Sequence, residues 1–107
     1  MALTKVKAGV IASDPVTVGI TTVSTASSMT ATANTHVYVS AAGQTITLPA
    51  SPSAGQRVLI TVGNFTDTVV ARNGSNIMGD ASDMTMDAAY LSIQFLYVDA
   101  SRGWVFA

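Results

Sequence analysis

Alternating polar and β-branched residues run through the chain from His36 onward and predict a series of short β-strands. Residues 45–48 alternate polar and apolar side chains before a proline ends the run, and residues 57–62 are rich in Val, Ile and Leu. Further strands are predicted at 36–39, 68–72, 84–86, 89–98 and 104–106. Short strands at this spacing favour a sandwich or a barrel over a βαβ fold.

Turn-forming residues separate these strands and suggest how they pair. Residues 49–55 contain two prolines, which predict a rigid, exposed connection. The pair Asn73-Gly74 predicts a tight turn, because both residues tolerate a positive φ. The Gly- and Asn-containing segment 63–67 predicts that strand 68–72 pairs back on strand 57–62 as a hairpin. Apolar residues on both faces at 96–98 predict a central strand buried on both sides.

The first third of the chain has a different pattern. Residues 2–15 show no sustained period and predict an extended arm, and residues 16–21 suit a strand. Residues 22–35 are almost entirely Thr, Ser and Ala, so they are expected to be flexible or to form strands against a partner's edge. We therefore expect an attachment arm at 1–15 and one β domain at 16–107, of which 16–35 depends on a partner. The expected fold is all-β, a small antiparallel β-sandwich or jelly-roll-like barrel with an extended N-terminal arm.

Low charge is the main feature of the composition. Only 10% of the 107 residues are charged, against about 25% in a typical soluble domain. With so few charges, much of the surface is expected to lie against other chains. The net charge of −1 argues against nucleic-acid or anionic-membrane partners. No segment approaches the ~20 apolar residues needed to cross a bilayer, and the absence of cysteine excludes disulfides and thiolate chemistry.

Few residues are candidates for catalysis or metal binding. The single histidine, His36, has no Cys or Glu in the chain to act with, so we expect a structural or partner-contact role, unless three copies meet on a trimer axis. Asp80, Asp83 and Asp87, with Asn73 and Asn76 nearby, are oxygen ligands that suit Ca²⁺. Their spacing matches no EF-hand, however, and turn capping is the preferred interpretation.

Other catalytic patterns are missing from the sequence. The glycines at 74 and 79 are not followed by Lys-Ser/Thr, and no Gly-x-Ser-x-Gly elbow occurs. Tyr97, Trp104 and Phe106 suit a sugar platform in principle, but aromatic residues near a closing strand are more typical of a core. The sequence therefore predicts a protein that is not an enzyme, with no cofactor and no catalytic or metal site.

Several stretches resemble a known kind of module. Residues 47–55 (Thr-Leu-Pro-Ala-Ser-Pro-Ser-Ala-Gly), residues 71–77 with Gly79, Tyr97-Val-Asp and Gly103-Trp104 resemble a β-module of tail fibres and other virion proteins of tailed bacteriophages. Residues 1–6 (Met-Ala-Leu-Thr-Lys-Val) resemble the first residues of phage tail fibres and tailspikes, where that stretch attaches the protein to the virion. The resemblance implies a small all-β unit that assembles as a homotrimer on a phage particle.

Two functions are consistent with this resemblance. The preferred one is a homotrimeric capsid decoration (cement) protein that binds the major capsid protein and stabilises the virion. The alternative is a short tail fibre or fibre-attachment module involved in host recognition, which contacts tail or baseplate proteins. A single module plus an arm favours decoration, whereas the first residues favour the fibre. The arm residues expected to bind the partner are Lys5, Val6, Lys7, Val10 and Ile11.

Overall fold

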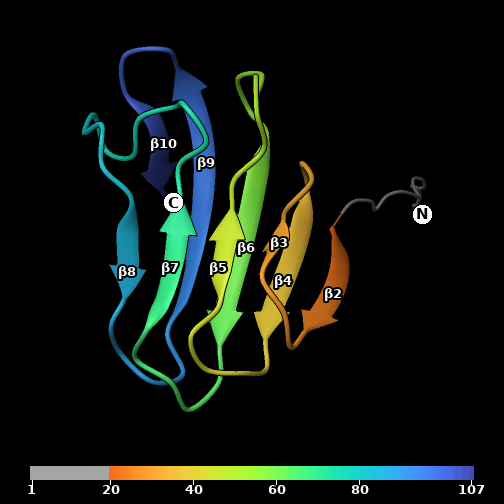
Figure 1. The fold of residues 1–107 in the computed structure, drawn as a ribbon. Helices are drawn as coiled ribbons and strands as arrows, with labels where there is room; N and C mark the ends of the chain where they lie inside the picture. Colours follow the sequence, from red (N-terminus) through yellow and green to blue (C-terminus); the bar gives the residue numbers. More distant parts are fainter. Residues whose placement is uncertain (1–19) are drawn as a thin grey trace, which may run out of the picture.

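All regular elements that the computed structural model describes, within residues 20–107, are β-strands (Figure 1). In chain order they are β2 (Thr21–Thr25), β3 (Met29–Thr30), β4 (Thr35–Val39), β5 (Thr45–Thr47), β6 (Arg57–Val62), β7 (Thr68–Ala71), β8 (Met84–Met86), β9 (Ser92–Asp99) and β10 (Gly103–Phe106). The all-β prediction is confirmed. The described part of the chain contains no helix with the length and hydropathy that crossing a bilayer requires.

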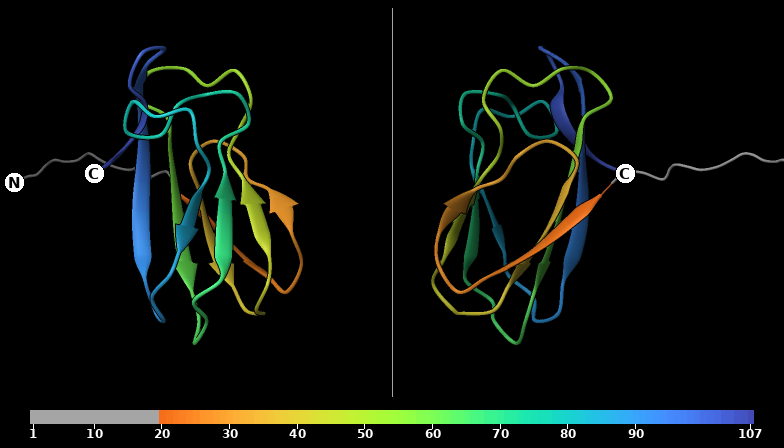
Figure 2. Two further views of the ribbon diagram at one scale, coloured as in Figure 1. Left: turned by 60° about the vertical axis from the view of Figure 1, so that its left-hand side comes forward. Right: turned by 90° about the vertical axis from the view of Figure 1, so that its right-hand side faces the viewer.

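The strands form two mixed sheets that face each other (Figure 2). One sheet has five strands in the order β10-β9-β6-β4-β2, and the other has four in the order β3-β5-β7-β8. From β2 to β7 the chain alternates between the sheets, so each strand pairs in parallel with the strand two places along. The chain thus makes three stacked coils, β2–β3, β4–β5 and β6–β7. Strands β8, β9 and β10 then close the stack with antiparallel pairs.

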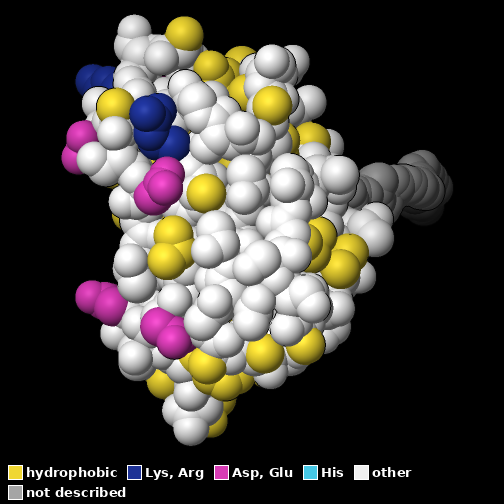
Figure 3. Space-filling view, viewed as in Figure 1, with side chains coloured by type: hydrophobic (Ala, Val, Ile, Leu, Met, Phe, Trp, Pro, Cys, Tyr) yellow, Lys and Arg dark blue, Asp and Glu magenta, His cyan; other side chains and the backbone are white. Residues whose placement is uncertain are grey.

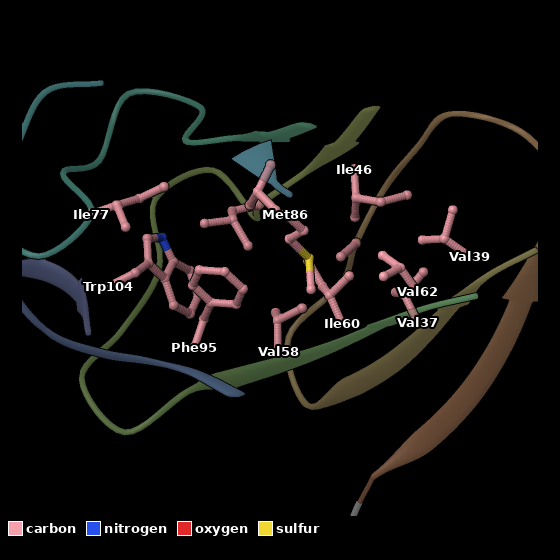
Figure 4. Close-up of a cluster of buried hydrophobic side chains, with 13 residues drawn as sticks. Val37, Val39, Ile46, Val58, Ile60, Val62, Ile77, Met86, Phe95 and Trp104 are labelled. Carbon is pink, nitrogen blue, oxygen red and sulfur yellow. The ribbon is translucent and has the colours of Figure 1, made fainter. Parts of the chain in front are cut away.

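Period-two burial explains why these segments form strands around a shared core. In β4, Thr35, Val37 and Val39 are buried while His36 and Tyr38 point outward. The same alternation in β6 buries Val58, Ile60 and Val62. The buried apolar side chains are Ala31, Val37, Val39, Ile46, Leu48, Val58, Ile60, Val62, Val70, Ile77, Met86, Phe95 and Trp104 (Figure 4). Most are β-branched or small, and the two large rings lie near β10.

The predicted antiparallel sandwich or jelly-roll-like barrel was wrong about strand direction. Four adjacent pairs are parallel. Parallel neighbours need a crossover connection, and here the crossover is a strand of the opposite sheet instead of a helix. Single strands give no signal of their partner's direction, so the pattern that predicts a strand could not predict this coiling.

Two finer predictions about pairing and burial were also wrong. Strand β7 does not form a hairpin with β6, because the segment 63–67 carries the chain across to the other sheet, where β7 pairs with β5 and β8. The C-terminal part of β9 is not buried on both sides. Leu96 and Tyr97 are half-buried and Val98 is exposed, since nothing in residues 20–107 covers the outer face of the five-stranded sheet there.

The Thr/Ser/Ala-rich segment 22–35 finds its pairing edges within its own chain. Strand β2 pairs with β4, and β3 pairs with β5. The predicted dependence on a neighbouring edge is therefore met by this chain's own next coil. The predicted arm at 1–15 and most of the predicted strand at 16–21 lie outside the described residues.

Candidate interaction surface

The two sheets have four edges, and the edge along β10 is covered by the chain itself. The backbone N–H of Trp104 donates to the carbonyl of Asn76 (2.8 Å), and the carbonyl of Trp104 accepts from the N–H of Met78 (2.7 Å). The N–H of Phe106 faces the Met78 sulfur at 3.4 Å. Residues 76–78 therefore form a strap that uses the outward groups of β10, so no further strand can pair there.

The edge along β8 is protected by its length and by charge. This strand has three residues, with Asp83 immediately before it and Asp87 immediately after it. Short strands flanked by charged side chains are common on sheet edges that do not pair with other chains. We call the side of the molecule formed by β8, β10 and residues 76–78 the closed end.

The opposite side, formed by β2 and β3, has two edges that no other strand of residues 20–107 covers, and we call it the bare end (Figure 2). Within β2, the N–H of Thr21 and the carbonyl of Thr25 bond toward β4, with distances of 3.3 Å to the Asn34 carbonyl and 2.8 Å to the Ser40 N–H. The alternation of a parallel ladder then directs the backbone groups of Thr22 and Ser24 away from β4. No strand among residues 20–107 lies beside them.

Strand β3 leaves a second set of backbone groups free at the bare end. The N–H of Ala31 donates to the carbonyl of Thr47 on β5 at 2.8 Å. By the same alternation, the backbone groups of the preceding residue, Thr30, point away from β5. Both sheets therefore end in an unpaired edge on the same side of the molecule.

The two ends also differ in their content of charged residues, as they differ in the hydrogen bonding of their edges. No Asp, Glu, Lys or Arg occurs between Asp14 and Arg57, so β2 to β5 carry none. On the face that Figure 3 shows, charged side chains gather beside β7 and β8, and none lies over β3. The described charged residues are Arg57, Asp67, Arg72, Asp80, Asp83, Asp87, Asp99 and Arg102. The bare end is thus uncharged as well as unpaired.

A row of hydrogen-bonded side chains crosses the outer face of the five-stranded sheet and starts at the bare end. The Nδ1 of His36 lies 3.4 Å from the Thr22 hydroxyl, and its Nε2 lies 2.8 Å from the Thr61 hydroxyl. Thr61 in turn lies 2.7 Å from the hydroxyl of Ser92. The row connects β2, β4, β6 and β9 on the outer face. Thr22 is the direct partner of His36, Ser92 is the direct partner of Thr61, and the His36–Thr61 contact is diagonal, because His36 is paired with Leu59.

This row has the residue types of a nucleophile–base pair but not its arrangement. An activated Ser or Thr needs a histidine that a third group orients, usually a carboxylate. The described partners of His36 are both threonine hydroxyls, and the row lies on a sheet face. The imidazole and the hydroxyls link side chains of four neighbouring strands by hydrogen bonds.

The predicted acidic cluster does not come together as a cation site. No three His, Cys, Asp or Glu side chains within residues 20–107 lie close enough to hold a metal ion. Asp83 instead accepts the N–H of Arg72, eleven residues earlier in the chain, at 2.9 Å, so its described bond connects two segments and does not cap its own turn. Asn76 donates to the carbonyl of Ser101 at 3.0 Å and so positions the strap.

The three C-terminal aromatic residues are divided between core and surface. Trp104 is fully buried in the core (Figure 4). It packs edge-to-face on half-buried Tyr97, with ring centroids 5.4 Å apart. Phe106 packs edge-to-face on the buried ring of Phe95 but keeps 47% of its surface exposed. The preferred core interpretation is confirmed for Trp104, which cannot serve as a ligand platform while it is buried.

Sequence reasoning missed the features that define this surface. Thr22 and Thr61 contact His36, and Ser92 contacts Thr61, only because the strand registers bring these residues side by side, and no local pattern encodes that alignment. The 42-residue interval without charge was visible in the sequence and could have located the bare end. The predicted partner-binding residues Lys5, Val6, Lys7, Val10 and Ile11 lie outside the described residues. Comparison with protein-family models and with curated proteins finds no match to this chain.

Proposed function

We propose that the protein is a non-enzymatic structural protein of a bacteriophage virion, a homotrimer that decorates the capsid and stabilises it. The observation that carries the proposal is the uncharged half of the molecule, which spans β2 to β5 and includes two unpaired strand edges. Surfaces with this little charge favour association with other protein chains. The resemblance of residues 47–55 and of residues 71–77 with Gly79 to a phage virion module supports a virion as the assembly.

The non-enzymatic part of the proposal draws on the outer sheet face. His36, the one histidine in the chain, is hydrogen-bonded to two neutral hydroxyls. Two of the described carboxylates accept backbone N–H groups. Asp99 accepts those of Ser101 and Arg102 within a turn, and Asp83 accepts that of Arg72. These groups are used for structure, so the residues best suited to chemistry are already occupied.

A short tail fibre, or a fibre-attachment module for host recognition, is the second candidate. The observation that favours it is the resemblance of residues 1–6 to the start of phage fibres and tailspikes. Immunogold electron microscopy of purified particles distinguishes the two. Label over the capsid surface supports decoration, and label confined to the tail or baseplate supports the fibre. A purified virion without the protein would contradict both.

The arm remains a separate part of this proposal. Residues 2–15 are predicted to bind the major capsid protein, with Lys5 and Lys7 meeting acidic surface and Val6, Val10 and Ile11 filling apolar grooves. Deleting residues 2–15 should abolish binding to particles while the circular dichroism spectrum keeps its β-signature. The matched control is Lys5→Glu/Lys7→Glu, which should weaken binding without removing the apolar contacts. Full binding by the deletion variant would place the anchor elsewhere in the chain.

A further inference from the structure

We propose that three copies of the chain join through their bare ends, with β2 of each copy pairing with β3 of the next. This inference rests on the proposed homotrimer and identifies its interface. It uses described residues only, and it makes the uncovered edges of one copy the partners of the uncovered edges of another.

The terminal coil at the bare end needs a cover. Stacked coils bury a continuous core, and their terminal coils require a cap. Residues 76–78 and strands β8 to β10 supply that cap at the closed end. At the bare end Val23 and Met29 are only half-buried, and Ile20 is 42% exposed. Apolar side chains and free backbone groups therefore meet solvent together there.

Within residues 20–107, the bare end lacks the features that keep edge strands from pairing with other chains. Natural edge strands resist pairing through charged side chains, proline or bulges. From residue 20 to residue 35 the chain has no charged residue and no proline, and the β2–β4 ladder has no irregularity. Two copies can therefore approach without like-charge repulsion or burial of a charge.

The directions of β2 and β3 fit a rotation axis that runs parallel to the strands. The two bare edges belong to different sheets, and β2 and β3 run in opposite directions (Figure 1). A rotation axis parallel to the strands keeps these directions in every copy, so β2 of one copy meets β3 of the next in antiparallel orientation. Such an unlike contact closes into a ring of three copies in the proposed homotrimer, whereas a two-fold axis perpendicular to the sheets would pair each edge with itself. The outward groups of Thr22 and Ser24 then face those of Thr30.

A proline substitution tests the pairing without disturbing the fold. In Ser24→Pro the lost N–H is one that points away from β4, and edge strands tolerate proline at such positions. Thr85→Pro on β8 is the matched control. The N–H of Val69 donates to Gln44 on the β5 side (3.0 Å), so its cross-strand partner Thr85 also directs its N–H outward, at the closed end.

Sedimentation of the full chain is the readout. The unmodified protein and Thr85→Pro should sediment at about three times the 11.0 kDa chain mass, and Ser24→Pro at one times this mass with an unchanged circular dichroism spectrum. A trimer that survives Ser24→Pro would overturn the proposed interface and leave the proposed function standing. A monomeric or dimeric unmodified protein would contradict the homotrimer itself, and the interface with it.

Cross-linking identifies which edges meet, and it keeps the proposal testable if Ser24→Pro fails to fold. The chain has no native cysteine, so two single variants, Ser24→Cys and Thr30→Cys, can be mixed and oxidised. Disulfide-linked pairs that contain one chain of each variant support the pairing of β2 with β3 between copies. Efficient linkage of Ser24→Cys with itself would indicate a two-fold contact along β2 and overturn the proposal. Absence of any linkage would overturn it as well.

Discussion

The closed end and the bare end are built from the same kind of short strand, yet they differ in how the sheets finish. At the closed end, residues 76–78 bond to both outward groups of Trp104, and aspartates flank β8. At the bare end, β2 and β3 have neither a covering segment among the described residues nor a charged neighbour. The difference shows that an unprotected edge is not a general property of this fold, because the same chain covers its β10 edge and keeps its β8 edge short and flanked by charge.

The burial of large side chains also differs between the closed end and the bare end. The two largest buried side chains, Trp104 and Phe95, lie in the strands nearest the closed end. The large apolar side chains of the bare end are less buried: Met29 is half-buried and Ile20 is exposed. Because burial of large apolar groups dominates folding free energy, the closed end should provide most of the stability of one copy. The bare end is then free to serve association.

The largest predicted effect comes from truncating the core of the closed end. Trp104→Ala should lower the free energy of unfolding by about 3–5 kcal/mol, because it removes a fully buried ring and leaves a cavity. Met29→Ala at the bare end should cost about 1–2 kcal/mol, since that side chain is half-buried. Urea unfolding of both variants measures the difference. Equal losses would mean that the two ends contribute alike.

A second prediction concerns the backbone where the strap meets β10. Gly103 has a φ of +70°, and a Cβ added there would collide with the backbone of Asn76. Gly103→Ala should therefore cost more than about 2 kcal/mol, because steric overlap adds to the left-handed strain. Gly74→Ala is the matched control, with a φ of +89° and open space around its added Cβ, and should cost about 1 kcal/mol. Thermal unfolding that ranks the two variants in the reverse order would disprove the importance of the strap contact.

The smallest predicted effect compares a polar turn at each end. Asp99 accepts the N–H groups of Ser101 (3.0 Å) and Arg102 (2.7 Å) before β10. Thr25 accepts the single N–H of Ser27 (3.1 Å) after β2. Asp99→Ala should cost about 1 kcal/mol and Thr25→Ala about 0.5 kcal/mol, because the carboxylate makes two charge-assisted bonds. Denaturant midpoints measured side by side check this order, and a larger loss in Thr25→Ala would contradict it.

The sequence predicted strands better than it predicted their partners. The segment 57–62 was found as the strand it forms, and the turn at Asn73-Gly74 has positive φ at both residues. These features are encoded locally, by β-branched residues and by tolerance of the left-handed region. The pairing of β6 with β4 and β9 depends on residues more than 20 positions away, so the local hairpin signal at 63–67 gave the wrong partner.

The sequence predicted the low charge of the candidate surface but not its location in the fold. The shortage of charge indicated contact with other chains, but its location required the sheet order. For His36 the sequence predicted a structural or partner-contact role, whereas its bonds to Thr22 and Thr61 depend on strand register. A single sequence contains the hydroxyls without indicating which of its many Ser and Thr residues align.

The stacking of two-strand coils also makes the length of the molecule adjustable. Thr21 pairs with Thr35, so one coil of the stack here takes 35 − 21 = 14 residues. Each added coil would lengthen the stack by about 4.8 Å, the spacing of neighbouring strands, without changing the coils already present. Duplication of a short stretch of gene sequence near residue 21 would therefore yield a taller protein with the same closed end, and evolution can vary reach independently of the core.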